Sequence, residues 1–422
     1  MKFYFPDSLD QVSPTFNFLT EEHSPYRVRQ RDDKYAHEVL EPQPYDGLLV
    51  SKAIVDGSVK GAGKYTMPQR QRLYRLGVSE YFRLPANVVT LGDCGAFNYV
   101  NEEVPPYTTE EVLDFYERCG FHSGISIDHV IFGYNPKVSD AEVDSSWKER
   151  RQISLRYAEE FHARVQDRGN KIEPVGAAQG WSPASYADSV KRLQEFGYQR
   201  IALGGMVPLK TQDILACLKE IDQVRLPETE LHLLGITRVG SMEEFAGYGV
   251  TSFDSTSPFR QAFMDDRNNY HTVAESFTAI RVPQVDANPA LKRQVLAGNV
   301  SQSEAKRNER ECLKRLRAYD QRDESLERVL EVLEEYEQLV DPPKIKINKI
   351  TGKETSTTRI PNYRHTLESR PWESCRCSLC ATCGIEIAIF RGSERNKRRG
   401  FHNLTVFADK MHHIKHPHVQ EI

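Results

Sequence analysis

Short apolar runs and longer amphipathic segments alternate along the chain between residues 45 and 260. The runs are rich in β-branched residues, which is typical of buried strands, and the longer segments repeat apolar positions every three or four residues, as helices do. The strand-like runs lie at 45–55, 86–93, 124–133, 171–180, 198–205, 230–237 and 250–256. The helix-like segments lie at 108–120, 144–166, 182–196, 211–221 and 241–249. This alternation predicts parallel β–α units.

A closed (β/α)8 barrel, the TIM barrel, is the predicted architecture. Seven strands are clear and a weaker eighth strand is expected at 277–284, which would complete the barrel. An open, doubly wound sheet is the alternative, because periodicity alone does not separate the two architectures. Gly120, Gly197 and Gly249 close three of the helix-like segments, where glycine commonly ends a helix.

A cluster of cysteines in the C-terminal region predicts a metal site. Cys375, Cys377, Cys380 and Cys383 fall within nine consecutive residues, and His402 follows them. Thiolates at these spacings can surround one tetrahedral ion, and zinc favours three sulfurs with one imidazole nitrogen. We therefore expect one structural Zn²⁺ per chain rather than disulfides or free thiols. Such a site has no open coordination position, so its role would be to stabilise the fold.

The sequences around the barrel predict further regions. Residues 302–340 have the pattern of one long charged helix, which ends before Pro342 and Pro343. The expected regions are an N-terminal extension at 1–44, the catalytic barrel at 45–300, the long helix at 301–341 and a basic zinc-binding region at 342–422.

The composition is ordinary for a soluble globular enzyme. Of 422 residues, 39% are hydrophobic and 27% are charged. The N-terminal sequence lacks an apolar signal core, and no run of about 18 apolar residues occurs, so neither export nor membrane insertion is expected. The other four cysteines are scattered, which fits a reducing compartment, so a cytoplasmic location is expected.

The charge is distributed unevenly along the chain. The net charge is −4, yet residues 343–400 hold 13 Lys and Arg against five Glu. A basic region next to a metal site predicts a surface that contacts phosphates, and a solvated linker is the alternative interpretation.

Residues with distinctive chemistry lie where the predicted strands end. In a parallel α/β barrel, such positions meet at the C-terminal face and carry the reactive groups. They are Asp93, Asp128, Gln179, Gly204, Gly205, Leu234 and Asp254. Three carboxylates, one amide and a Gly-Gly turn around one mouth would suit a planar polar ligand such as a heteroaromatic base.

Two of the carboxylates can be given complementary roles. Asp254 could attack a sugar carbon as a nucleophile, and Asp93 could move a proton to the leaving base and from the incoming one. Phe97, four residues after Asp93, could stack on the base. Cys94 is the alternative nucleophile, but His129 is expected to point away from it because neighbouring side chains on a strand alternate.

These motifs together resemble the queuine and archaeosine tRNA-guanine transglycosylases, a family of zinc-bearing barrels that exchange guanine for a 7-deazaguanine. The similar segments are GDCGAF, SIDH, AAQG, LGGM, LLGI, FDSTSP and the CxCxxC motif with its later histidine, and they occur in the same order over most of residues 45–410.

The resemblance implies a role for each matching residue. Asp254 would be the nucleophile and Asp93 the general acid and base. The base would be bound by Phe97, Asp128, Gln179, Gly204, Gly205, Met206 and Leu234. The zinc ligands would be Cys375, Cys377, Cys380 and His402. An all-cysteine site that uses Cys383 is the alternative.

Departures from the tRNA enzymes concern the nucleic-acid substrate rather than the chemistry. The nucleophile segment continues as SPFRQAFMDDRNN instead of PTRxARNG, and an insertion follows the first predicted strand. The chain is more similar to the DNA-guanine transglycosylase branch, which installs 7-cyano-7-deazaguanine in DNA. This implies DNA as the partner, with tRNA as the alternative, and allows an ATPase or helicase-like partner protein and a homodimer. A non-catalytic zinc-ribbon module that binds nucleic acid is a third hypothesis.

Basic residues in two segments are predicted to contact phosphates, on the basis of charge alone. They are Lys60, Lys64, Arg70 and Arg72 in the insertion, and Arg395, Lys397, Arg398 and Arg399 beside the cysteine cluster.

Overall fold

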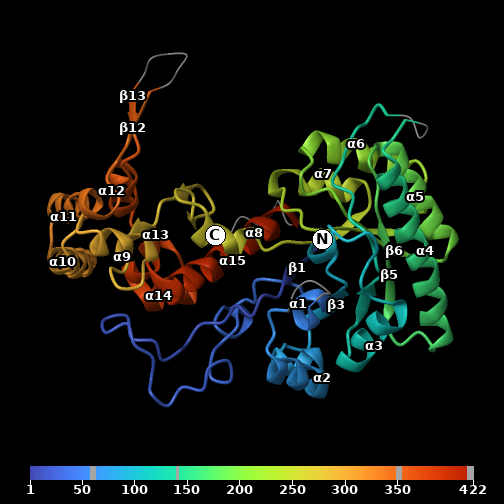
Figure 1. Cartoon of the computed structure of the whole chain (residues 1–422), viewed down its shortest axis with the longest axis horizontal. Helices are drawn as coiled ribbons and strands as arrows, with labels where there is room; N and C mark the ends of the chain where they lie inside the picture. Colours follow the sequence, from blue (N-terminus) through green and yellow to red (C-terminus); the bar gives the residue numbers. More distant parts are fainter. Residues whose placement is uncertain (58–62, 139–141, 348–353, 416–422) are drawn as a thin grey trace. The chain divides into compact units, whose positions relative to one another are not determined.

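The chain folds into two compact units in the computed structural model (Figure 1), which describes residues 1–57, 63–138, 142–347 and 354–415. The barrel unit comprises Met1–Leu9, Tyr45–Thr256 and Met411–Ile422, and the second unit comprises Asp10–Pro44 and Ser257–Lys410. Among the described residues, no helix is both long and apolar enough to cross a membrane.

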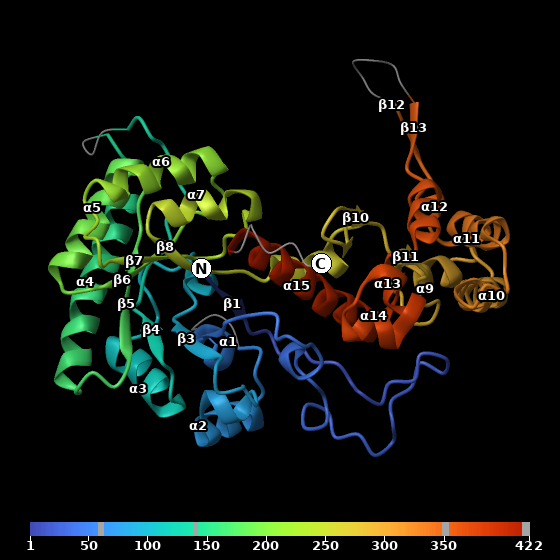
Figure 2. The ribbon, with the colours of Figure 1, turned by 180° about the vertical axis from the view of Figure 1, so that it is seen from behind.

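Eight parallel strands close into a barrel in chain order, which confirms the predicted TIM barrel. The strands are β1 (Lys2–Pro6), β2 (Gly47–Ser51), β3 (Val89–Asp93), β4 (Ser123–Ile125), β5 (Glu173–Ala178), β6 (Arg200–Leu203), β7 (Glu230–Leu233) and β8 (Val250–Asp254). Helices surround them, as Figures 1 and 2 show. These helices are α1 (Lys52–Asp56), α2 (Met67–Tyr81), α3 (Thr109–Cys119), α4 (Ser145–Asp167), α5 (Pro183–Glu195), α6 (Thr211–Asp222) and α7 (Met242–Gly247).

The barrel is filled by one face of its strands. Successive side chains of a strand point to opposite sides, so every second residue can enter the interior. The buried interior cluster is Tyr4, Leu49, Leu91, Ile125, Val175, Ala177 and Ala202. The apolar runs of the sequence therefore supply both the barrel interior and the surface that packs against the helices.

Local signals define the helix ends, as α3 illustrates. The Thr108 side chain accepts a hydrogen bond from the Glu111 backbone nitrogen, and the Glu111 side chain bonds back to the Thr108 nitrogen. Gly120 follows the helix with φ of 70°, in the left-handed region that glycine adopts without strain.

The predicted position of the eighth strand is wrong. Residues 277–284 contribute to β10 (Ser276–Phe277) and β11 (Ile280–Arg281), which belong to two-stranded sheets outside the barrel. The missing strand is β1, which pairs with β2 and β8 and so closes the barrel. Its residues lie within the predicted N-terminal extension, so the barrel begins before residue 45 and its last strand ends at Asp254.

The second unit consists mainly of helices. Its further elements are η1 (Ala36–Glu38), α8 (Ser257–Met264), β9 (Tyr270–His271), α9 (Pro289–Leu296), α10 (Gln302–Asp320), α11 (Leu326–Val340), β12 (Ile345–Ile347), β13 (Glu354–Ser356), α12 (Ile360–Ser369), α13 (Pro371–Ser374), α14 (Ser378–Cys383), η4 (Gly384–Ala388), β14 (Ile389–Phe390) and α15 (Gly392–Lys415).

The predicted single long helix is two helices, α10 and α11. Arg322 between them has a positive φ of 69°, which no right-handed helix contains, and the Ser325 hydroxyl caps α11 by accepting from the Arg328 nitrogen. The break lets the two helices pack together and bury apolar side chains such as Leu316 and Leu330. One continuous helix would leave those faces exposed.

Candidate active site and metal centre

Six barrel strands lead, at their carboxyl ends, into the residues predicted to be functional. Asp93 and Asp254 are the last residues of β3 and β8, and Gln179 directly follows β5. The others are Phe97 after β3, Asp128 after β4, Gly204, Gly205 and Met206 after β6, and Leu234 after β7. Because the strands are parallel in a closed barrel, these residues gather around one mouth.

The Asp254 carboxylate is held by two hydrogen-bond donors at one of its oxygens. Asp254 is buried, and its Oδ1 lies 3.1 Å from Nε2 of His232 and 3.1 Å from the backbone nitrogen of Gly235. The His232 ring is also buried, and its Nδ1 lies 2.9 Å from the Ser252 hydroxyl. The orientation of Asp254 is therefore set by β7, which carries His232, and by the backbone that follows this strand at Gly235.

Asp93 retains a proton at unusually high pH. Burial raises its pKa to about 7, and the negative charges of Asp128 and Asp254 act in the same direction. An ordinary aspartate titrates near pH 4. Asp93 therefore interacts with both of the other carboxylates, and it can release or take up a proton at neutral pH.

Asp128 and Gln179 form one buried hydrogen-bonded pair. Gln179 Nε2 donates to Asp128 Oδ2 over 2.5 Å, and Gln179 Oε1 accepts from the Ile131 backbone nitrogen at 3.2 Å. Burial raises the pKa of Asp128, although the hydrogen bond from Gln179 opposes this shift. The pair presents polar atoms in a fixed arrangement.

The Gly204–Gly205 turn provides the space that this pair needs. A Cβ atom on Gly204 would lie 2.2 Å from Gln179 Nε2, and one on Gly205 would lie 2.5 Å from the Ile131 carbonyl oxygen. Gly205 also has a positive φ of 76°. A side chain at either position would displace neighbouring atoms, including those of Gln179, so both positions require glycine.

Two aromatic rings are exposed in the loops at the mouth. Phe97 is 56% exposed and Phe132 is 42% exposed, and their ring centroids lie 5.3 Å apart. Leu234 instead packs partly against the barrel interior, and the Met206 side chain is fully buried. The Met206 side chain therefore offers no accessible surface to a ligand.

Cys94 lacks the properties of a thiolate nucleophile. Its sulfur is buried, accepts a hydrogen bond from Tyr99 at 2.9 Å and lies 3.4 Å from Asp128 Oδ1. Burial and the charges of Asp128 and Asp93 raise the pKa of the Cys94 thiol well above its ordinary value. The His129 ring bonds to the Glu102 carbonyl instead.

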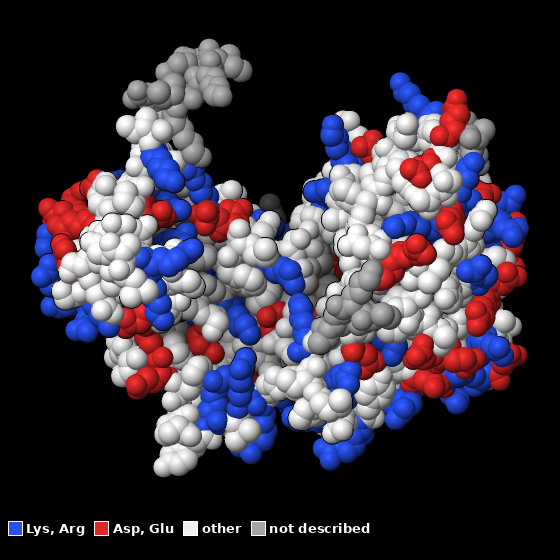
Figure 3. Space-filling model, viewed as in Figure 1, with Lys and Arg blue, Asp and Glu red and all other residues white. Residues whose placement is uncertain are grey.

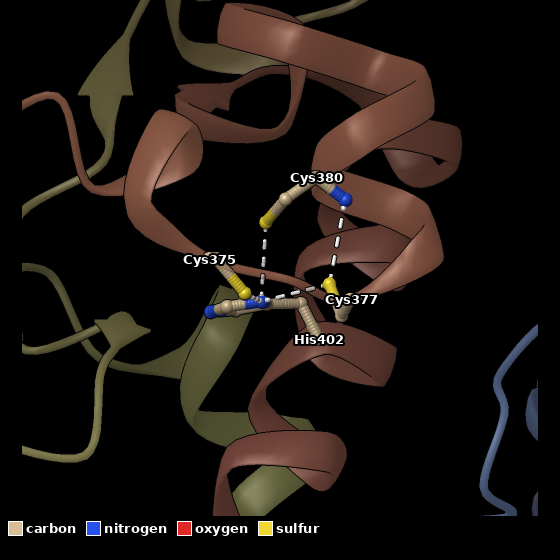
Figure 4. Close-up of side chains that lie close together, drawn as sticks. All are labelled: Cys375, Cys377, Cys380 and His402. Carbon is tan, nitrogen blue, oxygen red and sulfur yellow. Dashed lines mark hydrogen bonds between the residues drawn. The ribbon is translucent and has the colours of Figure 1, made fainter. Parts of the chain in front are cut away.

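In the second unit, three thiols converge on one imidazole, as Figure 4 shows. The sulfurs of Cys375, Cys377 and Cys380 lie 3.6, 3.4 and 3.3 Å from Nδ1 of His402. All four candidate ligand atoms lie within 4.8 Å of one another. Ordinary zinc bond lengths in a tetrahedron separate sulfur from nitrogen by about 3.5 Å. These four residues, and not Cys383, form the group that can hold a metal ion.

A second layer of contacts orients these ligands. His402 Nε2 donates to the His271 carbonyl over 2.7 Å, which leaves the Nδ1 lone pair directed at the thiols. The Tyr270 hydroxyl lies 3.3 Å from the Cys380 sulfur. The Cys377 sulfur caps α14 by accepting from the Cys380 nitrogen at 3.3 Å. The start of α14 therefore places Cys377 and Cys380 close together, at the position that the metal site requires.

Three arginines predicted to contact phosphates are buried, so that prediction is wrong for them. Arg395, Arg398 and Arg399 are 2%, 7% and 0% exposed. Arg395 bonds to Glu21 and Glu386, Arg398 bonds to Glu394, and Arg399 bonds to backbone carbonyls. These three guanidinium groups bind carboxylates and carbonyls within the second unit, because a buried guanidinium needs hydrogen-bond partners.

The other residues predicted to contact phosphates differ from one another in exposure and in the contacts that they make. Arg70 donates to the Asp56 carbonyl and Arg72 lies over the Tyr81 ring, whereas Lys64 is exposed. Lys397 is partly exposed and lies 3.3 Å from the Gln11 carbonyl, and Lys60 is outside the described residues. Basic and acidic side chains are interspersed on the face shown in Figure 3.

Sequence reasoning missed His232 and Phe132. His232 lies inside a strand, where a histidine has no distinctive local signal. Phe132 stands four residues after Asp128, which repeats the spacing of Phe97 after Asp93 and could have drawn attention to it.

Comparison with known proteins supports the resemblance seen in the motifs. No protein-family model matches the chain. The chain is 46% identical over 414 residues to a Salmonella montevideo protein named DNA-guanine transglycosylase, an alignment that covers 97% of this chain and 96% of that protein. The predicted family and its DNA-guanine branch are thereby confirmed. The chain belongs to the family of DNA-guanine transglycosylases, which are glycosyl-transferring enzymes.

Proposed function

We propose that this enzyme exchanges guanine in DNA for 7-cyano-7-deazaguanine through a covalent intermediate on Asp254. The observation that carries the proposal is the group of three interacting carboxylates at the barrel mouth, in which the pKa of Asp93 is raised to about 7. One ionised carboxylate and one protonated carboxyl group are the combination that glycosyl transfer with retention requires.

In the first step, an oxygen of the Asp254 carboxylate attacks C1′ of a deoxyguanosine. The bond between C1′ and N9 breaks, its electron pair leaves with the guanine, and Asp93 donates its proton to the departing base. The products are free guanine and a deoxyribosyl ester on Asp254. The target nucleotide has to leave the duplex stack for this reaction, at a cost of a few kcal/mol.

The second step reverses the first with a different base. Asp93, now a carboxylate, removes the N9 proton of the incoming 7-deazaguanine, and that nitrogen attacks C1′ while the bond to Asp254 breaks. Two inversions at C1′ give net retention. One N-glycosidic bond replaces another, so the exchange needs no nucleoside triphosphate as an energy source.

The base would be recognised on its edge and on its two faces. The buried Asp128–Gln179 pair offers acceptors to the N–H groups of guanine, and the backbone of Gly204, Gly205 and Met206 offers a donor to its carbonyl. Phe97 would cover one face of the ring and Leu234 the other. The exposure of Phe97 supports this role, because a stacking residue has to be accessible before the base enters.

DNA is the favoured nucleic acid because the similar Salmonella protein is named for activity on DNA. tRNA is the alternative substrate. A partner ATPase that opens the duplex and a homodimer are further proposals, which a comparison of single-stranded with duplex substrates and a measurement of molecular mass would test.

We propose zinc as the ion held by Cys375, Cys377, Cys380 and His402. The donor set of three thiolates and one imidazole fits a closed tetrahedral site, so the ion would stabilise the second unit without taking part in base exchange.

The decisive experiment measures base exchange with wild-type protein and with Asp254→Asn. Radiolabelled guanine or 7-cyano-7-deazaguanine is offered with single-stranded DNA, plasmid DNA or bulk tRNA. Wild-type protein should incorporate label into DNA, and Asp254→Asn should lower the rate by about 10⁴-fold, as loss of a catalytic carboxylate does elsewhere. Asp167→Asn, an exposed aspartate at the end of α4, should keep the wild-type rate.

Trapping the intermediate identifies the nucleophile. Without an incoming base, wild-type protein should form a protein–DNA species that survives denaturing gel electrophoresis and disappears when guanine is added. The same species with Asp254→Asn would exclude Asp254 as the nucleophile. Label in tRNA but not in any DNA would favour the alternative substrate.

A further inference from the structure

We propose that His232 is a positioning residue that orients the Asp254 carboxylate, at the end of a chain of hydrogen bonds that begins at Arg200. The proposal rests on Asp254 being the nucleophile, as proposed above. His232 is completely buried, with Nε2 3.1 Å from Asp254 Oδ1 and Nδ1 2.9 Å from Ser252 Oγ. Both ring nitrogens are therefore in use inside the barrel.

Strand register brings these groups together. His232 of β7 is paired with Ser252 of β8. Ser252 and Asp254 are two residues apart on the same strand, so their side chains lie on one face. The Tyr4 ring packs edge-on against the imidazole, with centroids 5.6 Å apart. This packing restricts rotation of the ring.

The Asp254 carboxylate sets the direction of the hydrogen bonds. An ionised carboxylate can only accept, so the contact with Asp254 Oδ1 requires the ring proton of His232 on Nε2. In a neutral ring Nδ1 is then an acceptor, and the Ser252 hydroxyl donates its hydrogen to it. The Arg200 NH2 nitrogen, which can only donate, lies 3.3 Å from the Ser252 oxygen and so completes the chain.

The neutral form of His232 is favoured by its surroundings. Burial lowers the pKa of His232, and the positive charge of Arg200 adds to this effect, whereas Asp254 opposes it. A neutral donor orients the carboxylate without protonating it, so Asp254 keeps the negative charge that a nucleophile needs.

The two oxygens of Asp254 would have different roles, because both hydrogen-bond donors contact Oδ1 and leave Oδ2 for attack. His232 and Gly235 both donate to Oδ1, so attack on C1′ through Oδ2 would leave these two bonds in place. When the ester forms, Oδ1 becomes its carbonyl oxygen and can still accept the same hydrogens. The donors therefore hold the carboxyl group in one orientation through both steps.

Substitutions of His232 test this role through their effect on rate and on affinity. His232→Leu removes the donor, and His232→Gln restores an N–H group near the position of Nε2. Loss of orientation should lower the single-turnover rate of guanine release by about 100-fold in His232→Leu, with an unchanged KM for DNA. The rate of His232→Gln should be at least about tenfold higher than the rate of His232→Leu.

Ser252→Ala and His162→Gln complete the comparison. Ser252→Ala removes the donor to Nδ1 and allows the other tautomer, so its rate should fall by about tenfold, again without a change in KM. His162 lies on α4 and packs its ring against Tyr198, so His162→Gln should keep the wild-type rate. If His232→Leu does not fold, His232→Gln and Ser252→Ala still test the positioning role.

Two results would overturn the positioning role. One is a wild-type rate in His232→Leu or Ser252→Ala. The other is an equal loss of rate in His232→Leu and His232→Gln that follows their loss of thermal stability. Failure of the proposed function would be distinguishable, because wild-type protein would then release no guanine and form no covalent species with DNA.

Discussion

Asp93 holds its proton at pH values where an exposed aspartate would have lost it. The ordinary pKa of 3.8 is raised to about 7 in the folded protein, so between these values the folded state binds a proton that the unfolded state releases. Stability contributed by this group is therefore lost as the pH rises from about 4 to about 7. The buried environment that keeps Asp93 protonated therefore also makes this residue a source of instability at neutral pH.

We expect Asp93→Asn to separate these two effects. The amide cannot transfer a proton, so base exchange should fall by about 10²–10⁴-fold. Above pH 7 the variant should be more stable than the wild type by about 1–3 kcal/mol, and below pH 4 the difference should vanish. Thermal unfolding measured across this pH range tests the prediction. A variant that is less stable at pH 8 would contradict it.

The pH dependence of the wild-type reaction supplies a second test at this residue. If protonated Asp93 is the acid that assists guanine departure, kcat/KM for guanine release should decline as the pH rises through about 7. In Asp93→Asn, the residual rate should lack this decline. The same profile in both proteins would assign the titration to another group.

At the scale of single elements, α14 shows how cysteine spacing shapes local structure. Cys377 stands at the N-cap of this short helix and Cys380 lies one turn later, so the cap and two candidate metal ligands coincide. A helix of six residues has little stability by itself. Its fold therefore depends on the contacts made by the thiols and by His402 of α15.

We predict that Cys377→Ser loses the metal while keeping the cap, because serine also accepts at an N-cap. The free energy of unfolding of the second unit should fall by at least about 3 kcal/mol, since structural zinc contributes on the order of 10 kcal/mol. Metal content and thermal unfolding are the measurements. Cys383→Ala is the matched control and should retain one zinc ion per chain. A Cys377→Ser protein that holds as much metal as the wild type would refute the ligand assignment.

At the scale of the whole molecule, residues 10–44 are an integral part of the second unit. Glu21 bonds to Arg391 and Arg395, each at 2.6 Å, and these arginines are 5% and 2% exposed. Burial alone would raise the pKa of Glu21, but hydrogen bonds and the charges of the arginines lower it to about 2. The N-terminal segment therefore neutralises two buried arginines, and one of them, Arg395, had been predicted from the sequence to contact phosphates.

Glu21→Gln should destabilise the second unit by about 1–3 kcal/mol, because Arg391 and Arg395 each lose one carboxylate partner and keep only the other, Glu309 and Glu386 respectively. In the wild type, stability from Glu21 is present above its ordinary pKa of 4.5 and is lost as the pH falls towards about 2. Chemical denaturation of both proteins at pH 7 and at pH 3 tests this. Glu22→Gln, at the exposed neighbouring position, should change stability little. A Glu21→Gln protein as stable as the wild type would contradict the network.

Much of the barrel and of its mouth was predictable because the signals are local. Seven strands and the helices between them have their own periodicity, and Asp93, Gln179 and Asp254 lie beside strand ends that any parallel barrel brings together. The clustering of the candidate metal ligands was predictable for the same reason, since thiols this close in sequence commonly share one ion.

Other features depend on which segments meet in space. β1 became the closing strand through its pairing with β2 and β8, and the break between α10 and α11 allows their apolar faces to pack. His232 acquired its contact with Asp254 from the register of β7 against β8. The order of residues determined the barrel pattern, the reactive groups and the metal-ligand set, because periodicity and side-chain chemistry are local properties. Burial of the arginines, the proton on Asp93 and the contact between His232 and Asp254 were decided only by tertiary packing, because each depends on charges and donors brought in from distant parts of the chain.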